Sequence, residues 1–172
     1  MAKHDVSVIN YSIFEDGTEY LGTSEVTFPE IAWNTSEFSG AGIAGTIDEV
    51  ILGHLEAMSA TFSFSTVTDA AISLNEPRVH NIDIRVAQQK YDTRSSATGV
   101  KSVRHVMKMK PKKFSPGKAA KASTADASGE YSVFYYAMYI DDQIVTELDP
   151  LNFICVINGN DYLADVRKAL GK

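Results

Sequence analysis

The chain has little of the chemistry that marks secreted, membrane-embedded or disulfide-stabilised proteins. It contains one cysteine in 172 residues, so no internal disulfide is possible, and we expect Cys155 to be a small core residue. The longest apolar runs are far too short to span a bilayer, so we predict no membrane anchoring. No apolar segment of the secretory kind follows the first residues, which favours a reducing cytoplasm as the place of synthesis and assembly.

One long segment has no acidic residues at all. Positions 93–125 hold nine Lys and Arg residues, whereas the rest of the chain holds all 22 acidic residues and only seven basic ones. The acidic remainder repels a nucleic-acid backbone, and the basic segment offers only Phe114 for stacking on bases. We therefore expect either a solvated strand face followed by a Lys-rich flexible loop at residues 111–129, or a docking surface for an acidic partner subunit.

Motifs for catalysis and for cofactors are also missing. The histidines are scattered, no Ser or Cys lies in a nucleophile motif, and no phosphate-binding loop is followed by Lys-Ser or Lys-Thr. The glycines at 40, 42 and 45 have the spacing of a dinucleotide-binding loop, but no buried strand precedes them and no helix of adequate pattern follows. We predict no catalytic residues, no metal and no cofactor, and not an enzyme.

What the chain does contain is a repeated β pattern. Runs rich in aromatic and β-branched residues alternate with turn signals such as Asp16-Gly17 and Asn158-Gly159. The expected strands cover residues 6–14, 18–22, 25–38, 47–51, 55–64, 79–91, 101–110, 131–140, 144–148 and 153–157, and the expected helices cover 66–75 and 162–170. This pattern predicts a single domain over residues 1–172: a mainly β, antiparallel β-sandwich or barrel with one flanking internal helix and a short C-terminal helix.

Three stretches in this pattern suggest surfaces with different tasks. The run from Tyr131 to Ile140 is apolar on both alternating faces, so one face requires cover from a helix or a neighbouring subunit. The run from Leu55 to Phe64 alternates apolar residues with small uncharged ones, which is typical of a strand with one hydrated face that lacks bulky side chains. The strand at 101–110 places its basic side chains opposite an apolar face of Val, His and Met residues.

An ordered set of short motifs resembles the major tail tube proteins of contractile-tailed bacteriophages and R-type bacteriocins. The set comprises Ile13-Phe14-Glu15-Asp16-Gly17, Tyr20-Leu21-Gly22, the segments 25–31, 37–45 and 55–58, Asp149, Asn152-Phe153, the segment 156–161 and Ala169-Leu170-Gly171. The Lys-rich region at 94–129 departs from the family pattern. The resemblance implies a structural subunit of an inner tail tube, in which hexameric rings stack into a hollow conduit for DNA passage or membrane puncture.

The resemblance also implies partners, a location and residue roles. The partners are further copies of the chain, the tail sheath protein, and the tape measure, baseplate and tail terminator proteins, with duplex DNA passing without specific binding. The location is the tail of a virion or phage-like particle, assembled in the bacterial cytoplasm. We expect inter-ring contacts within the loop region 39–51 (Gly40, Gly42, Ile43 and Gly45), a lumen wall at Ser59, Thr61 and Ser63, and sheath or neighbouring-subunit contacts at Arg104, Lys108 and Lys110.

Two other classes of protein remain open from the sequence. A soluble β-sandwich binding or adaptor module predicts an exposed aromatic platform and a stable monomer, whereas the aromatic residues here lie mostly in strand positions expected to be buried. An enzyme of unrecognised type is the third class. Electron microscopy of the purified protein separates these classes, because only the tube subunit forms rings or tubes.

Overall fold

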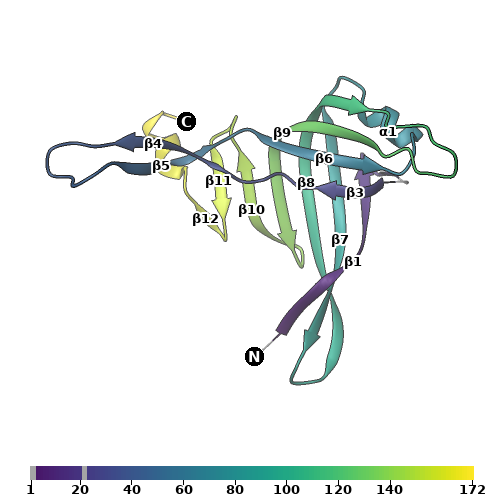
Figure 1. Cartoon of the computed structure of the whole chain (residues 1–172). Helices are drawn as coiled ribbons and strands as arrows, with labels where there is room; N and C mark the ends of the chain where they lie inside the picture. The colour runs from purple at the N-terminus through teal and green to yellow at the C-terminus, as the bar shows by residue number, and fades with distance from the viewer. Residues whose placement is uncertain (1–2, 21–22) are drawn as a thin grey trace.

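The computed structural model describes residues 3–20 and 23–172, which form an antiparallel β-fold with short flanking helices (Figure 1). The first strands are β1 (Lys3–Glu15), β2 (Thr18–Tyr20), β3 (Thr23–Thr27), β4 (Trp33–Phe38), β5 (Ile47–Leu55) and β6 (Met58–Phe64). After helix α1 (Asp69–Leu74) come β7 (His80–Asp92), β8 (Ala97–Ser115), β9 (Ala127–Ile140), β10 (Gln143–Asp149), β11 (Ile154–Ile157) and β12 (Asn160–Asp161), and then helix α2 (Ala164–Ala169). Neither helix is long and apolar enough to cross a membrane.

The main sheet has the strand order β12-β11-β10-β9-β8-β7-β1-β2. The long strand β9 shares its edge between two partners, because residues 127–133 pair with β6 and residues 136–140 pair with β10. Strand β6 also pairs with β3, so the sheet bends over its own apolar face. The described strands form this folded, sandwich-like sheet without closing into a barrel.

The burial of side chains in β6, β7 and β8 confirms the expected alternation of inward apolar and outward polar residues. Along β6 the apolar positions are buried and the small polar ones are half-buried, and β7 and β8 likewise turn their apolar faces inward. The inward residues of β7 and β8 are Ile82, Ile84, Val86, Val103, His105, Met107 and Met109. Cys155, on β11, is also fully buried in the core, as expected for a small core residue.

A β-bulge interrupts the alternation expected for residues 131–140. The register with β8 shifts between Lys108↔Tyr135 and Met109↔Val133, so Phe134 is an extra residue on β9. One extra residue moves every later side chain to the opposite face. Tyr131, Val133 and Tyr136 are therefore all buried, whereas strict alternation predicts Tyr136 on the face opposite the other two.

Two predicted boundaries need correction. The run 25–38 is two strands, because β3 ends at Thr27 and β4 begins at Trp33 in a separate sheet. Pro29 lies in this break, where its missing N–H removes no ladder hydrogen bond. The predicted loop at 111–129 is too wide, since β8 continues to Ser115 and β9 begins at Ala127. Pro111 is accommodated at a register shift between β8 and β9.

The helices are shorter than predicted, and they begin later, at Asp69 for α1 and at Ala164 for α2. The Thr68 hydroxyl accepts a hydrogen bond from the Ala71 N–H at 3.2 Å and so caps α1, as threonine commonly does at a helix start. Asp161 does not cap α2 directly. Its carboxylate accepts from the Leu163 N–H at 3.1 Å, one residue before the helix begins.

Two parts of the fold project from the body (Figure 1). The first, which we call the arm, is the hairpin of β4 and β5 with the loop between them, residues 33–55. The second, which we call the tongue, is the first half of β1 with the ends of β7 and β8, residues 3–10 and 88–101. The arm pairs only within itself, so it lies outside the main sheet.

One core side chain gives a testable dependence of stability on pH. His105 is 8% exposed, its ring stacks on Phe28 at 3.8 Å between centroids, and its Nδ1 lies 2.8 Å from the Tyr136 hydroxyl. Burial lowers the pKa of His105 to about 4. The unfolded chain binds a proton near pH 6.5, so between pH 6.5 and pH 4 the unfolded state binds more protons than the folded state.

The folded state is therefore expected to lose stability as the pH falls through this window, by up to about 1.4 kcal/mol per pH unit. Denaturant unfolding at pH 7, 6 and 5 measures the loss. The variant His105→Gln removes the titrating group, so its stability is expected to change less over the same range. An equal slope in both proteins would contradict the assignment.

Candidate assembly surfaces

The arm is a two-stranded ribbon with several exposed apolar side chains. Its exposed large hydrophobic residues are Phe38, Ile47, Val50, Ile51 and Leu52, with exposed fractions between 43% and 58%. An isolated two-stranded hairpin is marginally stable in water. A contiguous exposed apolar row marks a surface that another protein covers. The arm is therefore a candidate contact surface.

The predicted inter-ring residues lie together at the end of the arm. Gly40, Gly42, Ile43 and Gly45 belong to the loop between β4 and β5, and the Ile43 N–H donates to the Gly40 carbonyl at 3.1 Å. Gly42 has a φ of +94°, a conformation that favours glycine. A Cβ atom at any of these three glycines would meet open space within its own chain. The contact to a next ring stays a prediction.

The base of the arm depends on a glycine that the sequence reasoning missed. The register of β4 and β5 shifts between Trp33↔Leu55 and Thr35↔Val50, so β5 carries extra residues there. Gly53 lies in this bulge with a φ of +64°, and a Cβ at Gly53 would lie 2.4 Å from Leu163 Cδ2. An isolated glycine within a strand pattern is the sequence signal for such a bulge.

A side-chain contact also ties the arm at its base. The Asn34 amide donates to the Leu55 carbonyl at 3.1 Å and lies 2.5 Å from His54 Nδ1. Gly53 and Leu55 also line a pocket of about 450 Å³ whose other wall includes Leu163 and Val166 beside α2. The direction in which the arm leaves the body is therefore set where β5 meets α2.

The predicted lumen residues share one outer face. Ser59, Thr61 and Ser63 are half-buried on β6, opposite the inward-facing apolar row. Their cross-strand partners are Ser132, Glu130 and Ser128 on β9, with Thr27 and Glu25 beside Thr61 and Ser63 on β3. The face is thus built of small hydroxyl groups with carboxylates between them. Its placement on a channel wall stays a prediction.

The predicted basic contact residues, Arg104, Lys108 and Lys110, lie on the outer face of β8. They differ in how nearby groups offset their positive charges. Arg104 Nε donates to Asp83 Oδ1 at 2.8 Å, and this hydrogen bond raises the pKa of Arg104. Asp83 therefore offsets part of the positive charge on this face. Lys108 lies over the Tyr135 ring at 5.2 Å, and Lys110 is exposed. Contact with a sheath or a neighbouring subunit stays a prediction for all three.

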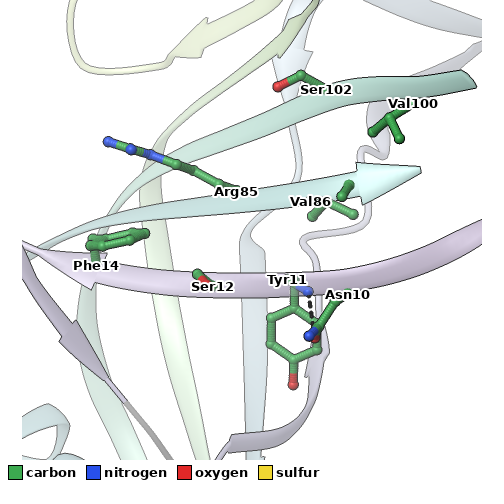
Figure 2. A pocket seen from close by; sticks show the side chains of 9 residues that line it. Asn10, Tyr11, Ser12, Phe14, Arg85, Val86, Val100 and Ser102 are labelled. Atoms are coloured by element: carbon green, nitrogen blue, oxygen red, sulfur yellow. Dashed lines mark hydrogen bonds between the residues drawn. The ribbon is translucent and has the colours of Figure 1, made fainter. Parts of the chain in front are cut away.

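A shallow pocket of about 430 Å³ opens where β1, β7 and β8 leave the body for the tongue (Figure 2). Phe14 and Arg85 lie at one end of it, with the guanidinium 4.7 Å from the ring centroid, and Val100 and Asn10 lie at the other. Within residues 3–20 and 23–172, no cluster of three or more His, Cys, Asp or Glu residues could hold a metal. The pocket offers shape and apolar surface rather than reactive groups.

Comparison with known proteins gives a consistent result. The family model described as phage tail tube protein FII matches residues 5–171. The chain is similar to the tail tube protein of Escherichia phage P2, with 24% identity over 165 residues covering 93% of this chain and 94% of that protein. It is equally similar to the major tail tube protein of Serratia phage KSP20, with 24% identity over 164 residues covering 94% and 93%.

Two cryo-EM structures of an extracellular contractile injection system share the fold. The first is the sheath/tube terminator in the extended state, with a TM-score of 0.55 and 11% identity, covering 79% of this chain and 97% of that one. The second is the sheath–tube complex in the extended state, with a TM-score of 0.51 and 11% identity, covering 75% and 87%. At this identity the likeness concerns the fold alone.

The family match explains why the described residues form projections that carry exposed apolar side chains. The family model matches nearly the whole chain, residues 5–171, and the family is structural rather than enzymatic. The chain belongs to the phage tail tube protein FII family, and it is a structural subunit of a tail tube.

Proposed function

We propose that copies of this chain form hexameric rings, which stack into the hollow inner tube of a contractile phage tail or phage-like particle. The observation that carries this proposal is the arm, whose large apolar residues stay 43–58% exposed in the described part of the chain and which pairs only within itself. Burying such a row against another copy contributes about 25 cal/mol for each Å² of apolar surface. The tube is a conduit for DNA passage or membrane puncture.

Simple geometry supports a ring of six. Six subunits that each contribute four strands, spaced about 4.8 Å apart, give a circumference of about 115 Å and a backbone diameter of about 37 Å. Side chains on the walls leave a channel on the order of 25 Å, which admits duplex DNA. Closing the sheets of all subunits into one cylinder also removes their exposed edges.

We place the small polar face of Ser59, Thr61 and Ser63 on the channel wall. DNA carries one charge per about 1.7 Å, so a basic wall would hold it, while a neutral or acidic wall lets it slide. We place Arg104, Lys108 and Lys110 toward the sheath or an adjacent subunit for the same reason. An uncompensated ring of these lysines on the channel wall would contradict this placement.

The partners follow from the place of the tube in the particle. The related injection-system structures are described as a sheath–tube complex and a sheath/tube terminator, which supports a sheath protein and a tail terminator as partners here. We also propose the tape measure protein as a partner inside the tube and the baseplate proteins as partners at its end. We propose that the tube assembles in the bacterial cytoplasm.

Negative-stain electron microscopy and sedimentation of the purified protein test the function. Rings or tubes are the expected result. A uniform population of monomers at high concentration would contradict it and would favour a binding module.

The loop at the end of the arm gives a specific prediction. Replacing Gly42 by valine adds a β-branched side chain at a φ of +94° in the loop proposed to contact the next ring. The variant is expected to fold, because its Cβ meets open space, yet to form tubes at least about tenfold less well. Gly17→Val is the matched control, since Gly17 also has a positive φ, +84°, and open space around its Cβ but lies in the turn between β1 and β2. Normal polymerisation of the Gly42→Val protein would refute the inter-ring role.

A further inference from the structure

A buried cluster of ionisable side chains lies where β1 ends and β7 begins. His80, the first residue of β7, is fully buried, and Glu15, the last residue of β1, is only 4% exposed. Glu76 and Arg78 lie in the segment between α1 and β7. The residue opposite His80 on β8 is the buried and uncharged Met109. His80 is therefore a buried titratable group that the proposed tube function does not explain.

Both ring nitrogens of His80 face oxygen atoms. Nδ1 lies 2.7 Å from Glu15 Oε1, and Nε2 lies 2.9 Å from the backbone carbonyl oxygen of Glu76. A carbonyl oxygen only accepts hydrogen bonds, and a neutral imidazole has a single N–H to donate. A neutral His80 would therefore turn a lone pair toward one of the two oxygens, which leaves a buried polar contact unsatisfied and destabilises the fold.

The carboxyl group of Glu15 does not supply the missing proton. Arg78 Nη1 donates to Glu15 Oε1 at 2.7 Å, and Arg78 Nη2 donates to Oε2 at 3.3 Å. An arginine that donates to both oxygens in this way binds an ionised carboxylate, and the guanidinium itself is always charged. Glu15 is therefore an acceptor at both oxygens, and the proton between Glu15 and His80 belongs to the ring.

The cluster also balances the charge of a protonated ring. Buried charges in proteins are paired with opposite charges, because an isolated one is costly. Arg78 Nε donates to the exposed Glu76 carboxylate at 2.8 Å, in addition to its contact with Glu15. With a protonated His80, the four side chains hold two negative and two positive charges, so the cluster is neutral.

We propose that His80 is a buried imidazolium that donates from both nitrogens, and that its second proton is a structural component of this junction. One ring then joins the end of β1 to the turn after α1 at the start of β7. Because both nitrogens are occupied by donated hydrogen bonds, the ring serves neither as a general base nor as a metal ligand. The inference concerns the fold of one subunit and does not depend on the proposed tube function.

NMR of the full chain labelled with ¹⁵N-histidine measures the protonation of each ring directly. The measurement is made at about pH 7.5, where an unperturbed histidine is mostly neutral. Both nitrogens of His80 are expected to carry protons. His105, whose pKa burial lowers to about 4, is the internal reference for a neutral ring with one protonated nitrogen. A His80 ring with one unprotonated nitrogen would overturn the proposal.

The variant Glu15→Gln tests whether the carboxylate holds the second proton. A glutamine amide can donate to Nδ1 while its oxygen accepts from Arg78, so the ring no longer needs two protons. His80 is expected to become neutral in this variant, with its remaining proton on Nε2. Glu19→Gln is the matched control, since Glu19 is exposed on β2, and it is expected to leave His80 doubly protonated. A ring that keeps both protons in Glu15→Gln would overturn the role of the carboxylate.

Discussion

Replacing Gly53 by alanine is expected to lower the free energy of unfolding by about 2–4 kcal/mol, because a left-handed backbone and an overpacked contact act together. The φ of Gly53 is +64°, and the new Cβ would lie 2.4 to 3.0 Å from three atoms of the Leu163 side chain. Leu163 is only 6% exposed, so it has little room to move away. Denaturant unfolding measures the change in stability.

Tube formation by the Gly53→Ala protein is expected to fall even under conditions in which the variant stays folded. The bulge at Gly53 sets how the arm leaves the body, so a shifted base displaces the whole ribbon. For stability the matched control is Gly45→Ala, since Gly45 has no positive φ and no atom near its Cβ, and its free energy of unfolding is expected to change by less than about 0.5 kcal/mol. Normal tube formation by the Gly53→Ala protein would show that the bulge does not position the arm.

Replacing Glu15 by alanine is expected to cost about 1–3 kcal/mol of unfolding free energy, because the fully buried His80 would lose a hydrogen-bond partner. Glu15 is 4% exposed, and its carboxylate accepts from Arg78 Nη1 at 2.7 Å. His80 Nδ1 lies 2.7 Å from the same carboxylate, while His80 Nε2 lies 2.9 Å from the Glu76 carbonyl. Hydrogen bonds to Glu76 and Glu15 raise the pKa of Arg78.

This cluster joins the end of β1 to the start of β7 and the turn after α1, far from the arm in the sequence. Thermal or denaturant unfolding of Glu15→Ala measures its contribution, with the exposed Glu19→Ala as control. The Glu15 variant is expected to assemble into tubes at temperatures where it stays folded. A loss of less than about 1 kcal/mol would show that water or other groups replace the carboxylate without penalty.

The sequence predicts those parts of this fold that depend on local periodicity. Strict alternation in β6, β7 and β8 identifies the inward side chains, because side-chain direction in a strand has a period of two. The cap at Thr68 is similarly local, since its partner lies three residues away. The family resemblance correctly supplied the function, which periodicity alone does not indicate.

Features that depend on register were not predicted. The extra residue Phe134 reverses the faces of β9, and its position is set by the pairing with β8 rather than by its own neighbours. The break at Pro29 separates β3 from the arm, although the residues on either side read as one strand. The requirement for glycine at position 53 arises from the close approach of Leu163, 110 positions later in the chain.

Electron cryo-microscopy of tubes assembled from the purified protein tests most directly whether each subunit is completed by its neighbours. We predict rings of six in which every arm is buried against an adjacent copy, with Ser59, Thr61 and Ser63 lining the channel. Tubes whose arms project freely into solvent, or a protein that stays monomeric at high concentration, would contradict this assembly.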